Sequence, residues 1–80
     1  VLLRKIFNGF CCLQNNNITI AGKFKINIPK NECLITFSTN TKLLINFDDG
    51  FPNGIGFQKD INGENYFVEY NEGDYIDIIN

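Results

Sequence analysis

The amino-acid sequence predicts an all-β protein, built as an antiparallel meander of β-hairpins with a period of about 23 residues, a length found in repeat proteins. Apolar and polar residues alternate along most of the chain, which is the pattern of strands with one buried face. Glycine, asparagine and proline interrupt the alternating runs, and these interruptions recur with the same period. No run carries apolar residues at the 3.6-residue spacing of a helix of several turns. A small β-sandwich or barrel is the alternative.

Seven strands follow from this alternation. The hairpin signal Asn62-Gly63 separates two of the runs. Pro29 and Pro52 are expected between strands, where a missing N–H is harmless. The predicted strands are 10–13, 18–26, 33–38, 42–47, 55–59, 65–70 and 74–79.

The period is clearest in three segments, NITIAGKFKIN, NTKLLINFDDG and GENYFVEYNEG. Asn27 and Asn40 stand where later copies have glycine. These two residue types enter the left-handed backbone region most readily, so the exchange preserves a turn. We predict one domain, 1–80, with repeats at 1–16 (partial), 17–39, 40–62 and 63–80 (partial), or a fragment of a longer array. The structural glycines are Gly50, Gly54, Gly56, Gly63 and Gly73, and the aromatics expected to pack between repeats are Phe24, Phe47, Tyr66 and Tyr70.

The stretch DDGFPNGIGFQKDINGENYFVEYNEG resembles the MORN repeat, whose consensus is close to YxGxxxxGxxxGxGxxxxxxG. The five structural glycines and Tyr66 stand at matching places, and Phe24, Phe47 and Tyr70 occupy the family's aromatic column. Val68 and Ile45 depart from a family glycine that Gly22 supplies in the first copy. The match is best over 40–73 and weaker over 17–39. The resemblance implies a non-catalytic hairpin array that acts as a scaffold.

Charge is distributed unevenly around a net of −2. Residues 1–40 hold five basic residues against one acidic, a net of +4, whereas residues 41–80 hold two against eight, a net of −6. An acidic half argues against nucleic-acid binding, which needs a clustered basic surface. It also argues against an anionic membrane, and VLLRKIFNGFCCL is too short and interrupted to span one. Opposite charges at the two ends favour a protein partner, or self-association from head to tail.

Catalytic and metal chemistry find little support in the sequence. The chain has no histidine, so Cys11 and Cys12 lack the usual base of a cysteine nucleophile. The glycines of residues 50–56 are not followed by a helix, as a phosphate-binding loop requires. Asp48-Asp49 is typical of a turn and lacks the ligand spacing of a calcium loop. We therefore expect no enzyme activity, no cofactor and no metal site.

Three cysteines, Cys11, Cys12 and Cys33, allow at most one ordinary bridge, and reduced thiols are expected. This slightly favours an intracellular setting, in the cytoplasm or cytoskeleton. The sequon Asn17-Ile18-Thr19 would matter only in a secreted protein. The redox state of the thiols and glycosylation of Asn17 are left open.

The leading functional hypothesis is a structural or interaction module that binds another protein through its sheet faces or terminal strand edges. The residues expected to contact that protein are Phe67, Tyr75, Glu72, Asp74 and Asp77. One alternative is a ligand-binding domain of the carbohydrate-binding or viral-fibre type. Another is a small SH3-like barrel in a nucleic-acid machine.

Overall fold

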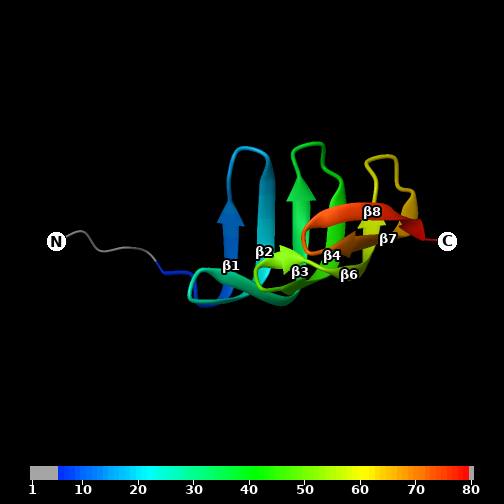
Figure 1. Cartoon of the computed structure of the whole chain (residues 1–80). Helices are drawn as coiled ribbons and strands as arrows, with labels where there is room; N and C mark the ends of the chain where they lie inside the picture. The colour runs from blue at the N-terminus through cyan, green and yellow to red at the C-terminus, as the bar shows by residue number, and fades with distance from the viewer. Residues whose placement is uncertain (1–5, 80) are drawn as a thin grey trace.

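The computed structural model describes residues 6–79, and β-strands are the regular structure of this range (Figure 1). The positive charges of Arg4 and Lys5, which contribute to the predicted asymmetry, lie outside it. The strands are β1 (Gly9–Gln14), β2 (Ile18–Lys25), β3 (Ile28–Phe37), β4 (Lys42–Asp48), β5 (Phe51–Pro52), β6 (Gly54–Lys59), β7 (Asn65–Asn71) and β8 (Asp74–Ile79).

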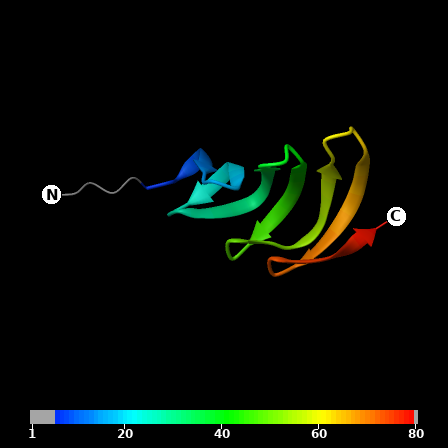
Figure 2. The same ribbon diagram turned by 90° about the horizontal axis from the view of Figure 1, so that it is seen from above.

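All strands belong to one antiparallel sheet in the order β1-β2-β3-β4-β6-β7-β8, and the short β5 pairs with β4 beside this path. The strands follow one another from the N-terminal to the C-terminal end, and the sheet twists along its length (Figures 1 and 2). The predicted all-β meander of hairpins is confirmed. The sheet is open, so the barrel that the sequence left as an alternative is not formed.

Left-handed backbone positions recur with the spacing of the predicted repeat. Two-residue loops follow β2, β4 and β7, and both residues of each loop have positive φ, which is the geometry of a type I′ turn. Asparagine and glycine also exchange at two further left-handed positions, of which that of Asn40 was predicted. The three loops are Ile26-Asn27, Asp49-Gly50 and Glu72-Gly73. At the two further positions, Asn40 corresponds to Gly63 and Asn31 corresponds to Gly54.

One face of the sheet, called the inner face, holds the core. Alternation brings every second residue of β4 to this face, so Leu43, Ile45 and Phe47 are buried while their neighbours are exposed. The remaining core residues come from β2, β3 and β7, and they are Phe24, Cys33, Ile35 and Val68. Phe24 and Phe47 are thus in the core, and Tyr66 and Tyr70 pack at its margin, half-buried.

Small and large residues interlock on the inner face. Gly22 in β2 lies against Cys33, where an added Cβ would meet Sγ at 2.5 Å. Gly56 in β6 lies against Ile45 and Leu43, and a Cβ added at Gly56 would lie 2.9 Å from a side-chain atom of each. Gly56 is therefore a close-packing position inside a strand, whereas Gly50, Gly54, Gly63 and Gly73 have positive φ.

The largest differences from the predicted strands both concern proline, and the other strand ends differ from the prediction by at most one residue. β3 begins at Ile28 rather than at residue 33, because the turn before it takes up only two residues; Pro29 lies inside β3, opposite Phe24. Pro52 lies in β5, opposite Phe47. The expectation that both prolines stand between strands is wrong. The pairing of β2 with β3 contains a bulge between the pairs Ala21–Leu34 and Lys23–Lys30, where an advance of two residues along β2 corresponds to four along β3.

Candidate functional site

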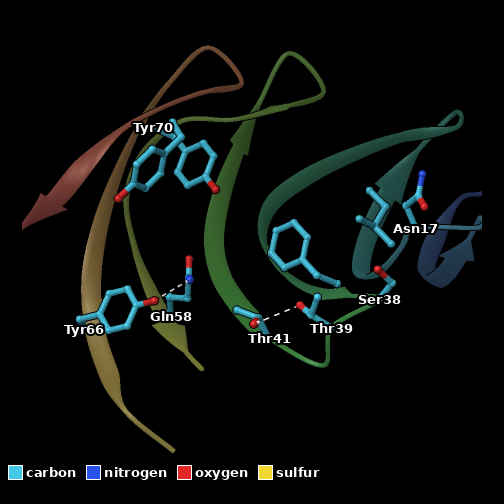
Figure 3. Close-up of a pocket in the computed structure, with 10 residues that line it drawn as sticks. Asn17, Ser38, Thr39, Thr41, Gln58, Tyr66 and Tyr70 are labelled. Carbon is cyan, nitrogen blue, oxygen red and sulfur yellow. Dashed lines mark hydrogen bonds between the residues drawn. The ribbon is translucent and has the colours of Figure 1, made fainter. Parts of the chain in front are cut away.

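A trough on the inner face is the concave feature that gathers the aromatic side chains of the C-terminal strands. It has a volume of about 480 Å³ and crosses the sheet from the start of β2 to β8 (Figure 3). Three cross-strand pairs line it, namely Ile18 with Phe37, Gln58 with Tyr66, and Tyr70 with Tyr75. Asn17, Ser38, Thr39 and Thr41 complete the lining at the turns. All three tyrosines of the chain thus border one trough.

A hydrogen-bonded cluster fixes one end of the trough. The Tyr66 hydroxyl donates to Asp60 Oδ1 over 2.6 Å, and Gln58 Nε2 donates to Tyr66 Oη over 3.0 Å and to Asp60 Oδ1 over 3.3 Å. The register places Gln58 directly opposite Tyr66, and the turn after β6 returns Asp60 to the same side. In Figure 3 the Gln58 nitrogen faces Tyr66, and its oxygen points away from that ring.

The two half-buried tyrosines hold their protons more tightly than usual. Donation to the Asp60 carboxylate raises the pKa of Tyr66 above its ordinary 10.0, because the bond requires the phenolic proton. Burial raises the pKa of Tyr70, and neighbouring Tyr75 adds to the effect. The Tyr70 and Tyr75 rings meet edge to face at 5.6 Å. The hydroxyls of Tyr66 and Tyr70 therefore remain neutral groups that donate and accept hydrogen bonds.

The opposite face, called the outer face, carries an apolar row that crosses every strand of the path. The register sets one residue from each strand beside the next, and we call this set the outer row: Cys12, Ala21, Leu34, Leu44, Phe57, Phe67 and Ile79. Leu44, Phe57 and Phe67 are 39%, 42% and 52% exposed. The rings of Phe57 and Phe67 contact each other edge to face at 5.3 Å. An apolar row with three such exposed members is typical of an interaction surface.

Lysines flank the outer row in pairs of like charge. Lys42 stands directly opposite Lys59, and Lys23 stands opposite Lys30. Like charges in such cross-strand positions repel each other. Within the described part of the chain these lysines make no ion pair, so an anionic group from outside would relieve the repulsion.

An acidic patch lies at the turns near the C-terminal end. Asp48, Asp49 and Glu72 surround the ring of Phe51, which is 57% exposed. The ring packs on Gly73, where an added Cβ would meet it at 3.2 Å. This patch has an apolar centre with carboxylates around it, which is the electrostatic complement of the outer row and its lysines.

The residues predicted to bind protein fall in separate places. Phe67 belongs to the outer row, and Glu72 belongs to the acidic patch. Asp74 and Asp77 lie exposed on the edge strand β8. Tyr75 is 52% exposed but stands opposite Tyr70 at the trough, because the two-residue turn after β7 pairs Asn71 with Asp74 and therefore Tyr70 with Tyr75.

Several trough and face residues were missed by the sequence reasoning. Phe37 and Gln58 come together only through the pairing of strands distant in sequence. The lysine pairs had a detectable signal, since Lys42 and Lys59 each stand two residues from an outer-row residue. Recognising it required the register between β4 and β6.

Residues 6–79 were searched for clustered metal ligands, disulfides and membrane-spanning helices. No group of three or more cysteine and acidic side chains there could hold a metal ion, and the range contains no helix able to span a membrane. Cys11, Cys12 and Cys33 are free thiols. The chain matches no protein-family model, and neither a curated protein nor a solved structure is detectably similar to it.

Proposed function

We propose that this chain is a non-catalytic structural module of the MORN-like hairpin type, and that the protein it binds is a second copy of itself. The meander and the left-handed positions that recur from one hairpin unit to the next support the repeat assignment. The observation that carries the binding proposal is the exposed outer row with its lysine pairs. An apolar surface between unpaired cations fits a partner with an apolar centre and carboxylates around it.

The acidic patch of the same chain has this chemistry. Phe51 supplies an exposed ring, and Asp48, Asp49 and Glu72 supply the carboxylates. Contact of one copy's patch with the next copy's outer face uses two different surfaces, so it is heterologous and joins copies head to tail. Salt at high concentration screens exposed charges and weakens such contacts.

Charge exchange between the two surfaces tests the proposal. The face variant carries Lys42→Glu and Lys59→Glu, and the patch variant carries Asp48→Lys and Asp49→Lys. All four positions are exposed, so folding should be preserved, as far-ultraviolet circular dichroism can verify. In sedimentation velocity at low salt, wild-type protein should form oligomers that dissociate at high salt. Each variant alone should sediment as a monomer.

An equal mixture of the two variants is the decisive sample. Each interface in the mixture then joins surfaces of opposite charge, so oligomers should reappear. A wild-type monomer at both low and high salt contradicts self-association. Oligomers that persist in each variant alone place the contact elsewhere.

A further inference from the structure

The polar atoms of the inner-face trough are not needed for core packing. Two sets of positions are equivalent in the predicted repeat. The first set is Ile20, Leu43 and Tyr66, and the second is Phe24, Phe47 and Tyr70. The earlier members of both sets belong to the core or pack against it without a hydroxyl. Only the last member of each set adds an oxygen, and both oxygens belong to residues that line the trough.

The trough offers fixed hydrogen-bonding groups. The Gln58 amide nitrogen donates to Tyr66 and Asp60, which fixes the orientation of the amide and leaves its carbonyl oxygen as an oriented acceptor. The Thr39 hydroxyl donates to Thr41 over 3.3 Å, which leaves the Thr41 proton as a donor. These groups are held in place before any ligand arrives, and this limits the entropy lost on binding.

The lining contains aromatic rings and neutral polar side chains, and no charged residue is among its members. Tyr75 presents a half-exposed ring whose orientation is fixed by the edge-to-face contact with Tyr70. A ligand that matches this lining has apolar faces for the rings and uncharged hydroxyls for the amide and hydroxyl groups. A pyranose has both, since its C–H groups form apolar faces and its hydroxyls donate and accept.

An extended peptide fits the trough less well. Peptides that add to a sheet pair along a free strand edge, whereas the trough lies on the face of the sheet, above β6 and β7, which are paired on both sides. We propose that the trough is a binding site for a neutral oligosaccharide. The site is independent of the self-association proposed above, because it lies on the inner face.

The chain carries its own reporter for this site. It has no tryptophan, and its three tyrosines all line the trough, so intrinsic fluorescence reports on the trough alone. The probes are neutral oligosaccharides of glucose, mannose, galactose and N-acetylglucosamine, each titrated at high salt to exclude self-association. At least one should give a saturable change in tyrosine fluorescence. Amide shifts in nuclear magnetic resonance spectra should map to the trough.

Variants separate this site from the rest of the molecule. Gln58→Ala and Tyr75→Ala should each weaken binding by about tenfold, which corresponds to about 1.4 kcal/mol. Phe67→Ala on the outer face is the matched control and should leave the dissociation constant unchanged. The proposal is overturned if no neutral oligosaccharide in the panel binds. It is also overturned if the trough binds a proline-rich peptide or an acidic oligosaccharide more tightly than every neutral one.

Discussion

Replacing Gly22 by alanine tests the close packing of β2 against the bulge of β3. The new Cβ would lie 2.5 Å from Cys33 Sγ and 3.1 Å from the Cys33 Cα. Favourable contacts between carbon atoms lie at about 3.5–4.0 Å. Sγ therefore has to rotate, and the β3 backbone has to move as well. The φ of Gly22 is not in the left-handed region, so the effect reports packing rather than backbone strain.

Two opposing terms set the magnitude. Alanine restricts the unfolded chain more than glycine, which stabilises the folded state by about 0.4–1 kcal/mol. Overpacking a well-filled core costs about 1–3 kcal/mol. Because both a side chain and a backbone atom obstruct the new methyl group, we place the cost in the upper part of that range. Gly22→Ala should lower the free energy of unfolding by about 1–2 kcal/mol.

Urea denaturation followed by circular dichroism measures this loss, and a double-mutant cycle locates its source. Cys33→Ala removes the closest obstructing atom, so Gly22→Ala should cost less in that background by about 0.5 kcal/mol or more. Cβ and Cα of residue 33 remain in place, so the rescue should be partial. A Gly22→Ala variant as stable as wild type would refute the packing of β2 on β3 described above.

Four further outcomes are expected. Leu43→Ala, at a fully buried core position, should lower the free energy of unfolding by about 2–5 kcal/mol in the same urea assay. Ile26 is β-branched, exposed and left-handed at φ 48°; Ile26→Asn should raise the free energy of unfolding by about 1 kcal/mol. The hydrogen bond from Tyr66 to Asp60 raises the pKa of Tyr66. Its contribution to stability is complete below pH 10, the pKa of tyrosine in the unfolded chain, and is lost as the pH rises through the pKa of the folded state. Ultraviolet titration of the Asp60→Asn variant should show a lower pKa for Tyr66. Burial raises the pKa of the Cys33 thiol and shields it from solvent, so a thiol reagent should label exposed Cys12 before Cys33. Equal labelling rates for Cys12 and Cys33 would contradict the fold.

The hairpin meander could be predicted because it depends on local signals. Alternation sets which side chains share a face, and residues such as Asn27 and Gly63 mark the left-handed turns. These signals act within a few residues of each other. They predicted the strand pairs correctly even though the start of β3, at Ile28, was misplaced to residue 33.

The binding surfaces depend on register, which is set between strands. The trough joins Asn17 to Tyr75 across the sheet from the start of β2 to β8, and no local pattern relates these two residues. Between β7 and β8, an irregularity beyond the pair of Tyr70 and Tyr75 brings Asp77 rather than Ile76 opposite Glu69. Bulges such as this one and that at Asn31 are the features that the sequence pattern did not reveal.

The strand count of the sheet path also limits how the structure can grow. Seven strands alternate in direction from β1 to β8, so the two edge strands run the same way. A second molecule shifted along the sheet axis without rotation would meet β8 in parallel, against the antiparallel pattern of the whole sheet. One more hairpin unit would add two strands and preserve the alternation. Lengthening of this sheet within one polypeptide therefore continues the alternation, whereas copies of the entire seven-strand path preserve it by edge pairing only if one of them is rotated by half a turn.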